Sequence, residues 1–198
     1  MSDGVPNVPM WMAVHEAGHA VVADALGFRV LGTTSTADAF SVQAYGNGGP
    51  FIDAVVAMAG AVAQERFGEP RGCGSHEDFA AAAHAVVDYV GKHATKEQIY
   101  ATIAAAEALA DDIIAARWDA VIAIASAIHE KHEQDASEME ALFAEWVPER
   151  PAAPWPKRPS ALLVLVARVV VRVWPSTWAH ELLTVDRQLG AHRKETEK

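Results

Sequence analysis

The feature that most constrains the fold is a helical pattern that fills residues 51–146 and is interrupted only by short breaks. Its first part is rich in Ala and Val and ends at Gly68, and Ser75 can cap the helix that follows a glycine-rich loop. The longest part has a break near residues 116–118. The pattern predicts helices at Phe51–Phe67, Ser75–Val90, Thr95–His132 and Ala136–Trp146. We therefore expect a mainly α-helical domain.

The segment before this pattern adds one more helix and two short strands. Pro9 suits an early position in a helix, and Gly27 suits the residue after its last turn. We therefore expect a helix from about Pro9 to Leu26. Two strand-like tetrapeptides, Phe28–Leu31 and Phe40–Gln43, follow it and are separated by a stretch with Thr, Ser and Asp. They predict one small β-hairpin.

A cluster of prolines marks the end of the helical pattern. Five prolines lie between positions 148 and 159, and proline lacks the amide N–H that a helix interior needs. We assign residues 1–147 to one folded domain, residues 148–160 to a Pro-rich linker and residues 161–198 to a basic, apolar C-terminal tail.

Charge and cysteine content narrow the class of protein. The formal net charge is −10, although residues 150–198 carry nine Lys or Arg against four Asp or Glu. The rest of the chain therefore carries −15, which argues against nucleic acid as a partner. The single cysteine, Cys73, excludes an internal disulfide framework and fits a reducing compartment. Residues 1–10 lack the basic start and apolar run of a secretory signal, so we expect a cytoplasmic protein.

The tail contains an apolar segment, Ala161–Trp174, that is broken only by Arg168 and Arg172. It is too short and too charged to span a bilayer, which takes about 20 apolar residues. As a helix, residues 161–178 would suit peripheral contact with an anionic membrane surface, because tryptophans and basic residues flank the apolar part. Packing of this segment on its own domain or on a second copy of the chain is the alternative.

His15, Glu16 and His19 form the motif H-E-x-x-H inside the first predicted helix. Four residues turn a helix by about 400° and advance it about 6 Å, so both imidazoles leave one face and can hold one metal ion. Glu16 lies about 100° around the helix, where its carboxylate can reach a water on that ion. Zinc lowers the pKa of such a water to about 7, so a carboxylate can take its proton. A chain of this composition is expected to contain about 0.03 such matches by chance.

Gly18 lies between Ala17 and His19 of this motif. Glycine costs a helix interior roughly 1 kcal/mol relative to alanine. Its presence predicts that another part of the chain approaches the helix closely at this position.

The segment Trp11–Val22 resembles the FtsH-type zinc metallopeptidase domain, whose motif is H-E-A-G-H followed by small and branched apolar residues. In that family a later helix has the pattern G-x-x-A-E-E-x-x-F-G. A loop rich in Gly and Ser then leads to an aspartate at the start of the next helix. Here Gly60–Gly68 resembles the helix, and Gly72–Phe79 resembles the loop and the aspartate. The resemblance covers roughly residues 10–145.

This resemblance implies both a site and an activity. It implies that Zn²⁺ is bound by His15, His19 and Asp78, with Glu16 as the general base. The implied fold is a helical zinc-metallopeptidase domain with one small hairpin. The implied activity is that of a zinc metalloendopeptidase, which hydrolyses peptide bonds of a polypeptide substrate.

Two departures from the family pattern leave alternatives open. The loop before Asp78 is one residue longer, so Glu77 or His76 could bind the metal instead. Where the family has two consecutive glutamates, this chain has Gln64 followed by Glu65. Glu65 either orients a zinc-bound imidazole through a hydrogen bond or forms an ion pair with an arginine on the helix surface.

The FtsH proteins also carry an ATP-driven unfoldase. These 198 residues contain no phosphate-binding G-x-x-x-x-G-K-[ST] loop. We therefore expect the chain to cleave flexible segments, or to work with a separate ATPase or as a homo-oligomer. The alternative is a non-proteolytic module that keeps the zinc site as a regulatory or adaptor centre.

Other polar residues near these motifs are expected to be structural. Cys73 suits a tight loop, and His84 lies on a different face of its helix from Asp78. His129 and His132 suit a solvated helix end. The strand that begins at Phe40 is either purely structural or pairs with the backbone of an extended substrate.

Overall fold

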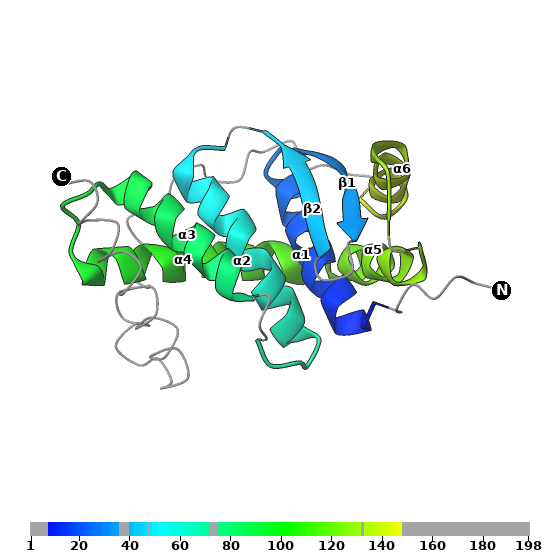
Figure 1. Cartoon of the computed structure of the whole chain (residues 1–198), viewed down its shortest axis with the longest axis horizontal. Helices are drawn as coiled ribbons and strands as arrows, with labels where there is room; N and C mark the ends of the chain where they lie inside the picture. Colours follow the sequence, from blue (N-terminus) through cyan, green and yellow to red (C-terminus); the bar gives the residue numbers. More distant parts are fainter. Residues whose placement is uncertain (1–7, 36–39, 47, 72–74, 132, 148–198) are drawn as a thin grey trace.

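The computed structural model describes residues 8–35, 40–46, 48–71, 75–131 and 133–147. Within them the chain forms a mainly helical domain with one antiparallel hairpin, which confirms the expected fold class at this level (Figure 1). The elements are α1 Met10–Ala25, β1 Arg29–Ser35, β2 Phe40–Tyr45, α2 Pro50–Arg66, α3 Ser75–Val90, α4 Lys96–Ala116, α5 Trp118–Lys131 and α6 Ala136–Trp146. The predicted linker (148–160) and tail (161–198) lie outside the described residues. None of the described helices is long and apolar enough to cross a membrane.

Capping groups and one break set the helix ends near their predicted positions. Thr95 caps α4 by accepting a hydrogen bond from the N–H of Gln98, and the Gln98 side chain accepts one from the N–H of Thr95. Asp135 and Glu138 form the same reciprocal box at the start of α6. The break predicted near residues 116–118 falls at Arg117, between α4 and α5. The boxes satisfy amide groups that have no partner inside a helix.

The hairpin is longer than predicted. β1 continues beyond the predicted end at Leu31, and a register shift between Val30 and Gly32 marks a bulge. On the outer edge of β1, the N–H of Thr33 donates to the carbonyl of Gln134 at 2.9 Å, and the reciprocal bond is 3.3 Å. These bonds and those to β2 provide partners for backbone N–H and C=O groups of β1 beyond Leu31. That segment was predicted to lie between the strands. β2 has no second strand partner in the part of the chain that the structure describes.

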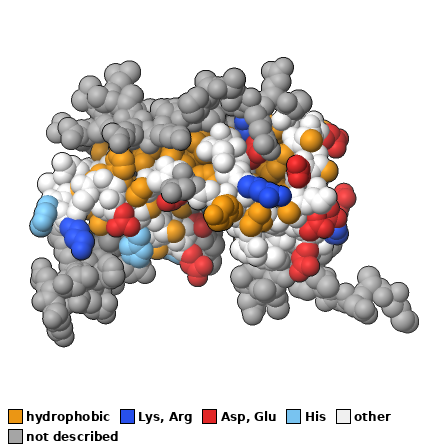
Figure 2. Space-filling view, turned by 90° about the horizontal axis from the view of Figure 1, so that it is seen from above, with side chains coloured by type: hydrophobic (Ala, Val, Ile, Leu, Met, Phe, Trp, Pro, Cys, Tyr) orange, Lys and Arg blue, Asp and Glu red, His pale blue; other side chains and the backbone are white. Residues whose placement is uncertain are grey.

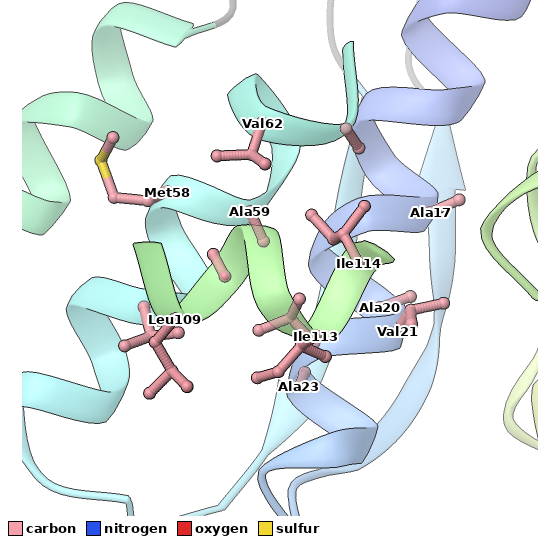
Figure 3. Close-up of a cluster of buried hydrophobic side chains, with 14 of the residues drawn as sticks. Ala17, Ala20, Val21, Ala23, Met58, Ala59, Val62, Leu109, Ile113 and Ile114 are labelled. Atoms are coloured by element: carbon pink, nitrogen blue, oxygen red, sulfur yellow. The ribbon is translucent and has the colours of Figure 1, made fainter. Parts of the chain in front are cut away.

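The core forms where small side chains let the helices approach closely. α1 packs against α2 and α5, and α2 packs in turn against α3 and α4. Figure 3 shows Ala17 and Ala20 of α1, Ala59 of α2, and Ile113 and Ile114 of α4 in this core. All five side chains are buried, so removal of their apolar surface from water stabilises the packing of α1, α2 and α4.

The close approach predicted at Gly18 is confirmed. A Cβ atom added to Gly18 would lie 2.6 Å from the Cβ of Ala63 and 2.7 Å from the carbonyl oxygen of Ala59, both in α2. Such distances are well inside van der Waals contact, so only glycine fits here without displacement of α2. The backbone of α2 therefore lies directly against the face of α1 that carries the two motif histidines.

Acidic side chains gather at one end of the molecule. Figure 2 shows them at the end where Figure 1 places α6 and the last turns of α5. Exposed carboxylates of this region include Glu130, Glu133, Asp135, Glu140 and Glu145. They contribute to the net negative charge of the first 149 residues.

We expect Gly18→Ala to lower the free energy of unfolding by about 1–3 kcal/mol, because the added methyl group overpacks the contact between α1 and α2. At an uncrowded helix position the same change would raise it by about 1 kcal/mol. Urea denaturation of both proteins measures the sign. Ala115→Gly, at an exposed position of α4, calibrates the helix-propensity contribution in this chain. A Gly18→Ala protein that resists urea better than the wild type would contradict the packing described here.

Candidate metal centre

Two helices bring three side chains together. His15 and His19 leave the same face of α1, and Asp78 lies in the first turn of α3. Oδ2 of Asp78 is 2.8 Å from Nε2 of His15 and 3.3 Å from Nε2 of His19, and the two Nε2 atoms are 3.2 Å apart. Among the described residues, this is the group of His, Cys, Asp and Glu side chains that converges closely enough to hold a metal ion.

The geometry distinguishes Asp78 from the two alternatives for the third position. The side chain of Asp78 is partly buried and reaches both imidazoles. Glu77 and His76 belong to the same helical turn but are exposed to solvent. Asp78 is therefore the residue that takes the third position of the group.

Hydrogen bonds to α2 orient both imidazoles. Nδ1 of His19 is 2.7 Å from the carbonyl oxygen of Val56, which can only accept, so this nitrogen carries a proton. Nδ1 of His15 is 3.1 Å from Oε1 of Gln64, to which it donates in the same way. Both rings therefore turn their Nε2 lone pairs towards Asp78.

The three converging atoms suit a cation between them. In neutral histidines with protonated Nδ1 atoms, the Nε2 atoms of His15 and His19 and the carboxylate of Asp78 are all electron-pair donors. A tetrahedral zinc ion with ligands at about 2.0–2.1 Å holds its ligand atoms about 3.3 Å apart. The observed separations of 2.8, 3.2 and 3.3 Å come close to this value. The three residues thus fit zinc, with one coordination position left for water or substrate.

The pKa shifts of His19 and Asp78 also favour a positive charge within the group. Burial works to lower the pKa of His19, but the hydrogen bond and charge of Asp78 outweigh it and raise this pKa to about 9. Burial works to raise the pKa of Asp78, but hydrogen bonds with His15 and His19 outweigh it and hold this pKa well below its ordinary value. At neutral pH the side chains alone therefore hold a proton that a metal ion must displace.

A glycine on α2 leaves room for the group. A Cβ atom added to Gly60 would lie 2.5 Å from Nε2 of His15 and closer still to Nε2 of His19. Gly60 therefore lies beside the atoms that would bind the ion, and any side chain there would crowd them. Val56, Gly60 and Gln64 are spaced four residues apart, so one stripe of α2 serves both histidines.

Glu16 lies beside this group and is 8% exposed. Burial raises the pKa of its carboxyl group, and the charges of His19 and His15 oppose that shift. The position next to His15 on α1 and the raised pKa both suit a group that accepts and returns a proton.

Of the two alternatives for Glu65, the contacts show the ion pair on the helix surface. Glu65 is exposed and forms an ion pair with Arg71 at 2.6 Å, and Arg71 also pairs with Glu107. Gln64, one residue earlier, is the side chain that reaches His15. A helix turns about 100° per residue, so the side chain at 64 faces α1 with Gly60 whereas that at 65 points outward. The four-residue spacing places Gln64 on the same side of α2 as Gly60, but the sequence alone does not show that this side faces α1.

Within the described residues, no other histidine belongs to this group. His84 is exposed on α3. Nδ1 of His129 is 2.6 Å from the carbonyl oxygen of Val8, a contact that holds the start of the described chain against α5. Cys73 and His132 lie outside the described residues.

Gly60→Ala should abolish tight metal binding while the protein stays folded. The added methyl group would face both Nε2 atoms, so we expect zinc affinity to fall about 100-fold or more. Competition with a chromophoric chelator measures the affinity, and circular dichroism checks the fold. Ala115→Gly is the control, because it changes a single methyl group at an exposed position of α4, outside the contact between α1 and α2. Equal zinc affinity in Gly60→Ala and wild type would contradict this site.

Zinc binding should release about one proton per ion at pH 7, because the pKa of His19 is raised to about 9 and its proton must leave. The apparent affinity should rise about tenfold per pH unit below pH 9 and then level off. Titration calorimetry in two buffers with different ionisation enthalpies counts the protons. A heat of binding that is the same in both buffers would contradict the protonated group described above.

The arrangement can hold one divalent cation and place a buried carboxylate beside it. A cation in this setting can polarise a substrate while the carboxylate moves a proton. In comparisons with known proteins, no family model and no curated protein matches this chain.

Proposed function

We propose that this chain is a zinc-dependent metalloendopeptidase of the kind that the FtsH-type domain represents. The observation that carries the proposal is the convergence of His15, His19 and Asp78 beside the buried Glu16. The resemblance in sequence supports the same assignment, because the residues that converge are those which match the family's motifs.

Each residue has a separate role in the proposed reaction. His15, His19 and Asp78 would hold the zinc ion. When bound, zinc would supply a Lewis acid that polarises the scissile carbonyl and makes a nearby water more acidic. Glu16 takes a proton from the attacking water and passes it to the nitrogen of the leaving amine. Its raised pKa favours this proton transfer, since a carboxylate with an ordinary pKa is a weak base at neutral pH.

The hairpin supports a polypeptide as the substrate. β2 packs against α1, and its outer edge pairs with no other strand of the described chain. An extended polypeptide can bind such an edge through its backbone hydrogen bonds. This mode favours flexible segments, because a folded segment does not offer a free strand. Delivery of folded proteins would require a separate ATPase, and its co-purification with the chain tests that partnership.

A second candidate is a non-proteolytic zinc module that acts as a regulator or adaptor. The presence of Gln64, where the resembled family has glutamate, favours this alternative, because it changes the environment of His15. Cleavage of an unstructured protein such as casein, with and without a chelator, separates the two. Zinc binding without any cleavage would favour the second candidate.

Glu16→Gln should keep the metal and lose the reaction. We expect stoichiometric zinc and a fall in casein cleavage of about 100-fold to 10,000-fold, the usual contribution of a positioned acid–base group. Glu145→Gln is the matched control, because it makes the same change at an exposed position of α6. Metal analysis and initial cleavage rates are the measurements. Undiminished cleavage by Glu16→Gln would refute the proposed mechanism.

A further inference from the structure

The side chain of Gln64 lies between one imidazole of the metal centre and the loop that follows α2. Its exposed fraction is 3%, so its amide group needs hydrogen-bond partners within the protein. Oε1 is 3.1 Å from Nδ1 of His15, and Nε2 donates to the carbonyl oxygen of Pro70 at 2.5 Å. The N–H of Glu69 also donates to the backbone carbonyl of Gln64 at 3.2 Å. The loop thus folds back onto Gln64 at two points.

The Pro70 carbonyl determines which way this amide points. A carbonyl oxygen can only accept, so the NH₂ end of Gln64 must face Pro70 and the oxygen end must face His15. An amide oxygen can also only accept, so Nδ1 of His15 must carry its proton. In a neutral imidazole, Nε2 is then the unprotonated nitrogen, and it faces Asp78.

We propose that Gln64 is a positioning residue that sets the tautomer of His15, so that Nε2 is free to bind the metal. The inference rests on the metal centre of the proposed function. Gln64 relays the orientation from the backbone at Pro70 to the imidazole of His15.

The two histidines differ in how they are controlled. His19 donates to the backbone carbonyl of Val56, which no substitution of a side chain removes. His15 depends on a side chain, whose oxygen accepts from Nδ1 of His15 and whose NH₂ group donates to the Pro70 carbonyl. Glutamate at position 64 would accept from His15 but would turn a carboxylate oxygen towards the Pro70 carbonyl, where two acceptors repel. Leucine would serve neither contact.

These differences give an experiment with three variants. Gln64→Leu removes both contacts, and Gln64→Glu removes only the donor to Pro70. Gln134→Leu is the matched control, because Gln134 is also buried and its amide also donates to a backbone carbonyl, that of Ala127, at 3.0 Å. The measurements are the ¹⁵N shifts of the histidine rings in chelator-treated full-length protein at pH 10, zinc affinity by chelator competition, and Tm.

Gln64→Leu should show loss of the protonated Nδ1 form of His15 and a fall in zinc affinity of about 10-fold to 100-fold. Gln64→Glu should keep this form and the wild-type affinity, but with a lower Tm. Gln134→Leu should lower Tm without a change in tautomer or affinity. A Gln64→Leu protein with the wild-type tautomer, or with zinc affinity within about threefold of wild type, would overturn the proposal.

Failure of this proposal and failure of the proposed function give different results. None of the three measurements involves cleavage of a substrate. A wild type that binds zinc but cleaves no casein would refute the peptidase, while the tautomer and affinity of Gln64→Leu would still decide the role of Gln64. A wild type without zinc affinity would refute both the peptidase and the metal-directed role of Gln64.

Discussion

The contact between the backbones of α1 and α2 is the constraint on which the candidate site depends. Gly18 on α1 and Gly60 on α2 each lack a Cβ atom at a point where one would collide with the facing helix. This closeness brings the Val56 carbonyl and the Gln64 amide within hydrogen-bond distance of the two imidazoles. Small buried side chains on both helices allow the contact to continue along their length. The same contact therefore determines both the packing of the two helices and the orientation of the two imidazoles.

The second constraint is electrostatic and follows from the first. Oxygen atoms of α2 accept hydrogen bonds from the Nδ1 atoms of both histidines. The Nε2 atoms of His15 and His19 therefore meet the carboxylate of Asp78 as a group of electron-pair donors. Such a group is stable only with a positive charge in its midst, either a proton or a metal ion. The raised pKa of His19 shows that, without a metal ion, a proton supplies this positive charge. The proposed zinc binding would therefore compete with protonation of this group.

Much of this arrangement could be predicted from the sequence, because it depends on local rules. Helix ends follow from capping residues such as Thr95 and Asp135, and the histidine spacing follows from the pitch of a helix. The extent of β1 could not be predicted, because one of its residues, Thr33, pairs with Gln134, which lies 101 positions later. The roles of Gln64 and Glu65 depend on which side of α2 faces α1. Only helix packing determines how α2 is rotated about its axis. In the structure, Gln64 contacts the imidazole of His15 and Glu65 forms the surface ion pair.

We propose that two imidazoles and one carboxylate of this chain bind one zinc ion. X-ray absorption at the zinc edge, together with metal analysis of the purified full-length protein, tests it most directly. We expect one zinc per chain, with nitrogen and oxygen ligands at about 2.0–2.1 Å and the outer-shell scattering of two imidazoles. A sulfur ligand at about 2.3 Å, which only Cys73 or a methionine could provide, would contradict it. A zinc content far below one per chain would contradict it as well.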